Sequence, residues 1–376
     1  MTEKKLRIWL LTNAPSPYQM EYLAAVGQHV QMDMRLMRGS LAGAAWNAGE
    51  LPSGAQILPA WGSGKWRDEC RVHPGALREV RSGTHDAYVL SGVYTSPTFL
   101  LCAVILHWRR KPWAVWFERP WPEDYRPEWA SRATARSGIA RFLRRKILGW
   151  LLAKADRVFC IGSAAVAAYY RDWGVPGDKL VFMPYVCDLQ PFHQAGREPA
   201  ERIRFLYVGL LVKRKGVDLL MTAFQRLAAE NAAVELVVAG SGPMEAELRR
   251  MVSDRVRFVG SVKRDDLPAL YGDADVFVFP SRHDGWGVVI NEACGAGMPV
   301  IVTSSTGAGA DLVVDGVNGI VVERDDPEGL YQAMKFMADH PESRAAFGAR
   351  SKEKSALVDI PAGVERFVRA MENLAG

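Results

Sequence analysis

Two carboxylates flank a glycine-rich turn, and their spacing suits an extended ligand. Asp284 lies in the turn Ser281–Gly287, and Glu292 follows after seven intervening residues. The apolar residues Val276–Phe279 predict a strand that enters this turn, and a helix is expected to leave it. The first amides of a helix attract anions. With a rise of about 1.5 Å per residue, Glu292 lies at least one turn from those amides, so a ligand that reaches both is longer than a phosphate.

A nucleotide sugar has this length and the matching chemistry. We expect Glu292 to accept both ribose hydroxyls, the helix amides to face the diphosphate, and Asp284 to meet the sugar or its phosphate. The plain alternative is a strand, a turn and a buried helix with one exposed acid, which any doubly wound domain could contain.

A basic segment follows an earlier predicted strand. Ile203–Gly209 is apolar enough for a buried strand, and Lys213, Arg214 and Lys215 come shortly after it. The resemblance described next implies that these cations meet the diphosphate that sugar transfer releases, because positioned cations stabilise its growing negative charge in the transition state.

Both segments resemble the donor site of the retaining glycosyltransferases of the GT-B fold, family 4 (glycosyl transferases group 1). In that family two glutamates separated by seven residues precede a helix of small residues and Gly-x-Pro-Val. Here Asp284 and Glu292 take the two acidic positions, and Gly297-Met298-Pro299-Val300 follows. Lys215-Gly216-Val217-Asp218 also matches, with Lys215 in the place of the diphosphate lysine. Leu210 stands where the family has an arginine, and Arg214 or Lys213 is expected to compensate.

The resemblance implies a retaining, metal-independent transfer of a sugar from a nucleoside diphosphate sugar to a hydroxyl acceptor, with no cofactor and no metal. It implies catalytic roles for Asp284, Lys215 and Arg214. The donor-binding residues that we expect are Gly209, Val262, His283, Gly285, Trp286, Gly287, Val288 and Glu292. His283 either assists the reaction or is a structural histidine of the loop.

The acceptor side is expected in the first half of the chain. Ser16 and Tyr18 follow a predicted strand at 6–12, in a stretch that resembles the first loop of many family members, which faces the interdomain cleft. Glu118 ends the strand predicted from Trp113, where many family members have a histidine. Glu118 either orients the acceptor or acts as a base, or it forms a structural ion pair with Arg119.

The charge is unevenly distributed. Residues 1–195 hold 25 Lys and Arg against 16 Asp and Glu, whereas the remainder holds 22 against 26. A basic amphipathic helix rich in arginine and tryptophan is predicted from about Gly138, and its face either lies on anionic lipid or is solvated. No nucleic-acid-binding motif accompanies it, so nucleic acid is disfavoured as a partner.

Several features of the sequence bear on the cellular compartment of the protein. The five cysteines are scattered without a Cys-x-x-Cys pair, which indicates reduced thiols, and no secretory signal is recognised. The apolar run Thr98–Trp108 is about half the length that spans a bilayer and predicts a buried helix. We expect a cytoplasmic protein, with peripheral association at the inner face of the cell membrane as an option.

Repeated strand, loop and helix units predict an α/β fold of two doubly wound, Rossmann-like parallel sheets facing a cleft. We expect residues 1–190 to bind the acceptor, 191–202 to form a linker and 203–360 to bind the nucleotide sugar. Residues 361–376 are expected to form a helix, which the resemblance implies returns to the first domain.

Two other functions remain open at this point. A sugar-nucleotide epimerase shares the fold but needs acid and base residues that the sequence does not place. A non-catalytic nucleotide-sugar-binding protein is consistent with Leu210 and the shortened Asp284. For a transferase, the acceptor could be a glycan or exopolysaccharide, a lipid-linked oligosaccharide or a small molecule with a hydroxyl.

Overall fold

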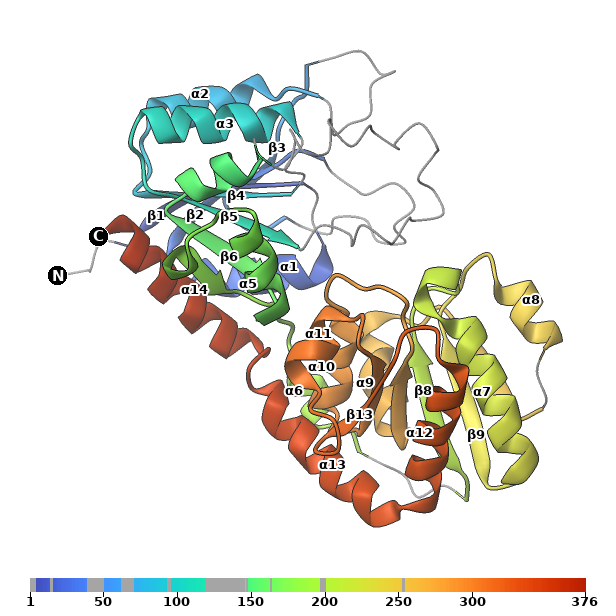
Figure 1. The fold of residues 1–376 in the computed structure, drawn as a ribbon. Coiled ribbons are helices and arrows are strands. Elements are labelled where there is room, and N and C mark those ends of the chain that lie inside the picture. The colour runs from blue at the N-terminus through green and yellow to red at the C-terminus, as the bar shows by residue number, and fades with distance from the viewer. Residues whose placement is uncertain are drawn as a thin grey trace. The chain divides into compact units, whose positions relative to one another are not determined.

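The computed structural model describes residues 5–13, 16–38, 51–61, 71–92, 96–118, 146, 148–162, 164–196, 201–251 and 254–376. The described residues form two compact units, which Figure 1 shows in one ribbon. The first unit contains the described residues up to Val186 together with Ile360–Gly376, and the second contains Cys187–Asp359.

The described part of the first unit is built on a seven-stranded, entirely parallel sheet of order β3-β2-β1-β4-β5-β6-β7. The strands are β1 (Arg7–Thr12), β2 (Gln31–Leu36), β3 (Ala55–Ile57), β4 (Ala87–Ser91), β5 (Trp113–Glu118), β6 (Arg157–Ile161) and β7 (Leu180–Phe182). The helices are α1 (Pro17–Val26), α2 (Pro74–Ser82), α3 (Pro97–Trp108), α5 (Ala164–Asp172) and α14 (Ile360–Ala375), with helical residues also at 148–154.

The two faces of this sheet have different helices on them. Alternate residues of each strand point to opposite faces, so Trp9 and Leu11 join one core with residues of α2, α3, α5 and the helical segment 148–154. On the other face, Phe367 of α14 lies with its ring centroid 6.0 Å from Trp116 and 6.1 Å from Phe159. The hydroxyl of Tyr22 in α1 donates to the Gly363 carbonyl at 3.0 Å. The last helix of the chain is therefore part of the first unit.

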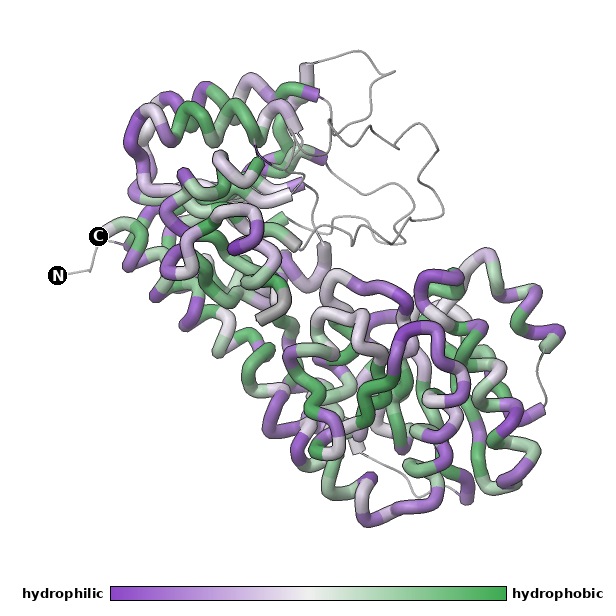
Figure 2. The backbone as a smooth tube through the Cα atoms, viewed as in Figure 1, coloured by the Kyte–Doolittle hydropathy of each residue, from purple (hydrophilic) through white to green (hydrophobic). Residues whose placement is uncertain are grey.

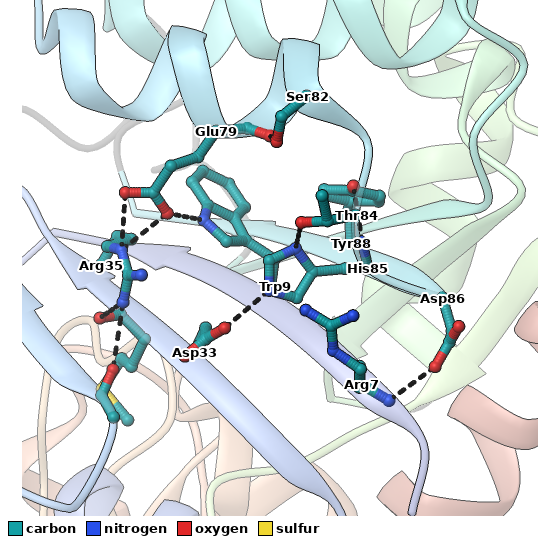
Figure 3. A network of polar contacts seen from close by, with 12 residues as sticks. Arg7, Trp9, Asp33, Arg35, Glu79, Ser82, Thr84, His85, Asp86 and Tyr88 are labelled. Carbon is teal, nitrogen blue, oxygen red and sulfur yellow. Dashed lines mark hydrogen bonds and ion pairs between the residues drawn. The ribbon is translucent and has the colours of Figure 1, made fainter.

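A polar network fixes α2 against strands β1 and β2 of this sheet (Figure 3). The Glu79 carboxylate accepts from the Trp9 indole N–H at 2.8 Å and from the Arg35 guanidinium at 2.8 Å. His85 contacts Asp33 at 2.7 Å between Nε2 and Oδ2. The Glu79 side chain thus points toward the sheet, where its carboxylate is hydrogen-bonded to the buried Trp9 and the half-buried Arg35.

The described part of the second unit has a six-stranded parallel sheet of order β10-β9-β8-β11-β12-β13. Its strands are β8 (Ile203–Val208), β9 (Val234–Ala239), β10 (Val256–Gly260), β11 (Val276–Phe279), β12 (Val300–Thr303) and β13 (Gly319–Val322). Its helices are α6 (Gln190–His193), α7 (Val217–Glu230), α8 (Glu245–Arg250), α9 (Leu267–Gly272), α10 (Val288–Gly295), α11 (Gly307–Leu312), α12 (Pro327–Asp339) and α13 (Pro341–Ser355).

The helix α7 of the second unit buries one apolar side. In α7, Leu220, Phe224 and Leu227 are at most 1% exposed and recur at helical spacing. Asp326 caps α12 by accepting from the Gly329 N–H at 2.8 Å. Figure 2 shows the hydrophobic colour gathered on the strands, as expected for a parallel sheet that is covered on both faces.

The predicted fold class, two doubly wound parallel sheets, is confirmed. One strand was not predicted, and one helix differs from the expectation. The edge strand β3 pairs with β2 and was not among the predicted strands. The helix α3 is not fully buried, because Leu101, Val104 and Trp108 are exposed on its outer side. The basic helix predicted from Gly138 lies outside the described residues except for its end.

Four buried cysteines provide a test of the packing in the two units. Cys102, Cys160, Cys187 and Cys294 are free thiols at most 2% exposed. Burial raises the pKa of Cys102, Cys160 and Cys294 to about 12, and that of Cys187 well above its ordinary value. At pH 8 a thiol of pKa about 12 is ionised in about one molecule in ten thousand, and the thiolate is the reactive form.

We therefore expect these four cysteines to resist iodoacetamide at pH 8 in the native protein and to react fully in urea. Mass spectrometry of the digested protein measures each site separately. Fast labelling of any one of them without denaturant would contradict the packing around it.

Candidate functional site

The second sheet reverses its strand order between β8 and β11. From β8 the chain proceeds outward to β9 and β10, and from β11 it proceeds the other way to β12 and β13. The pairing between β8 and β11 ends at Leu206 and Phe277, two residues before either strand ends. Open α/β sheets bind ligands at the carboxyl ends of the strands beside such a switch point. The loops that follow β8 and β11 are therefore the candidate site.

These two loops are bound to each other. The Arg214 carbonyl accepts from the Arg282 N–H at 2.8 Å and from the Ser281 hydroxyl at 3.2 Å. The Arg214 guanidinium donates to the His283 carbonyl at 2.8 Å. Gly216 permits this approach, because its φ is 69° and a Cβ there would lie 1.9 Å from the Pro280 oxygen.

Two of the predicted catalytic residues meet at this junction. The Lys215 ammonium forms an ion pair with the Asp284 carboxylate, and their side chains are 13% and 14% exposed. The same ammonium lies 4.8 Å from the centroid of the Phe279 ring, at the end of β11. The structure thus brings together a cation and an acid that the sequence separates by 69 residues.

Asp284 remains ionised in this setting. Burial alone raises its pKa, but the Lys215 ammonium beside it, the Arg214 guanidinium and the Trp286 backbone N–H outweigh burial. The net result is a pKa below the ordinary value. The junction consequently holds a fixed negative charge next to positive side chains at neutral pH.

Glu292 lies within α10 and is 1% exposed. One of its carboxylate oxygens accepts from the Tyr271 hydroxyl at 2.7 Å, and that tyrosine of α9 is itself fully buried. This hydrogen bond from Tyr271 orients the Glu292 carboxylate. Tyr271 was not predicted from the sequence, because nothing in the sequence pairs α9 with α10.

The turn before α10 is held internally. Gly287 precedes the helix with φ 95°, a conformation that favours glycine. Trp286 is 1% exposed and its indole donates to Asn291 at 3.0 Å. His283 is 4% exposed, which fits a structural part of the loop. Gly285, Gly287 and Val288 are half-buried at this edge.

Arg282 is a second residue that sequence reasoning missed. Its guanidinium binds both oxygens of Asp218 at 2.7 and 2.9 Å, and it also contacts Asp325 at 2.5 Å. Its Nη1 further donates to the Lys213 carbonyl at 2.5 Å. Arg282 therefore holds in place the loop that contains Lys213, Arg214 and Lys215. The available signal was an arginine inside the turn of the motif and an aspartate two residues after the Lys-Gly pair.

The remaining positions that were predicted to bind the donor lie just after the carboxyl ends of strands in the same sheet. Gly209 ends the β8 segment, and its N–H donates to the Ala239 carbonyl at 2.9 Å. Leu210, in the place of the family's arginine, is 56% exposed and supplies no charge. Val262 is half-buried just after β10, two strands from β8.

The predicted acceptor-side residues belong to the first unit. Ser16 caps α1 by accepting from the Gln19 N–H at 3.3 Å, and Tyr18 is half-buried in the first turn of that helix. Glu118 is the last residue of β5. All three thus lie at or just after the carboxyl ends of β1 and β5, where doubly wound domains bind ligands.

No group of three or more His, Cys, Asp or Glu side chains that could hold a metal ion occurs within the described ranges. Across the same residues, no helix has both the length and the hydropathy needed to cross a bilayer.

Comparison with known proteins links the second unit to a family. The family model described as Glycosyl transferases group 1 matches residues 190–354. A GDP-mannose-dependent monoacylated alpha-(1-6)-phosphatidylinositol monomannoside mannosyltransferase of Corynebacterium glutamicum is 36% identical over 152 residues, 38% of this chain and 39% of that protein. A GDP-mannose-dependent alpha-(1-6)-phosphatidylinositol monomannoside mannosyltransferase of Mycobacterium tuberculosis is 34% identical over 50% of this chain and 51% of that protein. This chain therefore spans about half or less of the length of these two relatives.

Solved structures extend the likeness to nearly the whole chain. HepE of Anabaena in complex with UDP has a TM-score of 0.74 at 16% identity, covering 98% of this chain and all of that one. Sucrose-phosphate synthase of Thermosynechococcus elongatus has a TM-score of 0.71 at 20% identity, covering 98% and 99%. At these identities the likeness concerns the fold. The chain has the GT-B fold of two Rossmann-like units, and its residues 190–354 match the model of the glycosyl transferases group 1 family.

Proposed function

We propose that this protein transfers a sugar from a nucleoside diphosphate sugar to a hydroxyl acceptor, with retention at the anomeric carbon and without a metal ion. The observation that carries the proposal is the junction of the loops after β8 and β11. It places Lys215 and Arg214 beside Asp284, at the strand ends where the sheet reverses its order. Such positioned cations suit a reaction whose leaving group is a diphosphate.

In this proposal each residue of the junction has a defined role. Lys215, supported by Arg214, binds the diphosphate and stabilises its charge as the bond to the sugar breaks. Asp284 holds Lys215 in place and contacts the sugar or its phosphate. Glu292, oriented by Tyr271, binds the ribose hydroxyls. The acceptor oxygen attacks from the face that the diphosphate leaves, and the departing phosphate takes the acceptor's proton.

We further propose a lipid-linked acceptor and a cytoplasmic protein that associates peripherally with a membrane. The two relatives described above are named for phosphatidylinositol mannoside acceptors, which are lipids. Their names specify GDP-mannose, whereas HepE was solved with UDP. Sugars linked to GDP and sugars linked to UDP therefore both belong in the first assay of donors.

The test is the release of nucleoside diphosphate from a panel of UDP-, GDP- and ADP-sugars, with the native protein, Glu292→Ala and Tyr271→Phe side by side. We expect one donor class to be consumed by the native protein. Glu292→Ala should raise KM for that donor about tenfold or more, because a charged hydrogen bond contributes about 1.5 to 3 kcal/mol. Tyr271→Phe keeps the carboxylate and should have a smaller effect.

The outcomes separate the rival functions. Conversion of the free nucleotide sugar to its epimer without an acceptor would indicate an epimerase. Tight binding without release against any acceptor would indicate a binding protein. If calorimetry finds no binding of any nucleoside diphosphate, the donor site is wrongly assigned.

A further inference from the structure

The outer side of α3 is apolar and exposed. Leu101, Val104 and Trp108 recur at helical spacing and are 44%, 41% and 81% exposed. The helix contains no Asp, Glu, Lys or Arg from Pro97 to Trp108, and Figure 2 shows hydrophobic colour along it. Large side chains exposed together on one face of a helix mark an interaction surface more often than chance.

A second exposed tryptophan adjoins this helix. The Trp150 side chain is 55% exposed, and its ring centroid lies 6.4 Å from that of His107 in α3. The Lys154 ammonium lies 5.8 Å from the Trp150 ring centroid. The apolar surface is thus continued by Trp150 and bordered by a cation.

Among the residues that the structure describes, the exposed charges that directly follow α3 and those on the neighbouring helix α2 are positive. Arg109 and Arg110 follow directly on Trp108 and are exposed. On α2, which packs beside α3 (Figure 1), the exposed charged residues are Arg78 and Arg81. The acid of that helix, Glu79, is turned inward onto Trp9 and Arg35. Asp156 is the nearest exposed acid in the chain after Lys154, and it accepts from the Trp113 N–H.

We propose that the surface formed by Leu101, Val104, Trp108, Arg109, Arg110, Trp150 and Lys154 binds an anionic lipid bilayer. Tryptophan favours the membrane–water interface, and arginine and lysine next to it attract anionic headgroups. A second copy of this chain fits less well, because a two-fold contact would bring the same basic residues face to face. The proposal deepens the membrane association proposed above by giving it a surface, and in that sense it rests on it.

The surface extends along the length of α3. This helix follows β4 and precedes β5, so Leu101 lies toward the carboxyl ends of the strands, and Trp108 and the two arginines lie toward their amino ends. The predicted acceptor-side residues Ser16 and Glu118 lie at the carboxyl ends of β1 and β5. A bilayer bound along α3 therefore lies against the face of the sheet that this helix covers.

Flotation with lipid vesicles tests the proposal without donor or acceptor, so its result does not depend on sugar transfer. The protein is mixed with vesicles of phosphatidylcholine alone or with one third phosphatidylglycerol, at low and high salt. We expect binding only to the anionic vesicles, weakened by salt. Arg109→Gln/Arg110→Gln and Trp108→Ser should each lower the partition coefficient about tenfold.

Matched controls lie elsewhere on the protein. Trp61→Ser removes another exposed tryptophan, which is 76% exposed, and Arg249→Gln/Arg250→Gln removes two neighbouring arginines of α8. Both should bind like the native protein. Equal loss in the controls, or native binding by the α3 variants, would overturn the proposal. So would light scattering that shows a dimer which Trp108→Ser dissociates, because a second copy would then occupy the surface.

Discussion

Replacing Lys215 by methionine is expected to lower kcat for sugar transfer by about a hundredfold to a thousandfold, the loss typical of removing a group that stabilises developing charge. Lys215 lies in the loop after β8 with its ammonium on Asp284 and near the Phe279 ring. In the native chain Leu210 offers no charge that could substitute. Steady-state kinetics with the donor found in the panel would measure this change.

The same substitution leaves Asp284 without its main counter-charge, and the stability should respond to pH. In the native protein the pKa of Asp284 is lower than the ordinary 3.8. The pair therefore stabilises the fold fully above that value, and its contribution is lost as the pH falls through the folded pKa. In Lys215→Met burial dominates, so that pKa rises and the variant should lose about 3 kcal/mol at pH 7 and less at pH 4.

The double variant Lys215→Met/Asp284→Asn separates stability from catalysis. It removes both charges, so urea unfolding at pH 7 should return close to the native free energy while turnover stays low. If the double variant regains turnover, Lys215 serves only to neutralise Asp284, and its role on the diphosphate would have to be abandoned.

Phe367→Ala is expected to destabilise the first unit by about 3 to 5 kcal/mol, as large-to-small substitutions of buried aromatic residues do. The Phe367 side chain is fully buried among Tyr22, Trp116 and Phe159, with ring centroids 6.0 to 6.3 Å away. Equilibrium urea unfolding, followed by tryptophan fluorescence, measures the loss because Trp116 touches the site.

Phe336→Ala is the matched control, because Phe336 of α12 is 36% exposed and belongs to the second unit. It should cost much less than Phe367→Ala. A loss below about 1 kcal/mol for Phe367→Ala would show that α14 contributes little to the first core.

The strands were predictable because their sequences are distinctive. Val234–Ala239, Val276–Phe279 and Val300–Thr303 are short, mostly apolar runs closed by turn residues, and Val276–Phe279 was predicted with the bounds found in the structure. Buried parallel strands produce this pattern because both of their faces are covered. The edge strand β3 was missed, since only three residues pair there and two of them are exposed.

The junction of the site was predictable only in part. Lys215 and Asp284 were each expected to meet the donor, but their contact with each other depends on the strand order, which places β8 next to β11. Arg282 binds Asp218 across 64 residues, and Tyr271 reaches Glu292 between two helices. Such contacts follow from tertiary packing, and local patterns of residue type do not encode them.

The position of α14 bears on how the chain folds during synthesis. The first unit includes Ile360–Gly376, while all the described residues of the second unit lie between Cys187 and Asp359. Domains commonly fold in the order in which they leave the ribosome. Here the second unit can fold before the first is complete, because Phe367 emerges after all of it. Until then, Trp116 and Phe159 lack their cover, and chaperones would meet the first unit with that apolar face open.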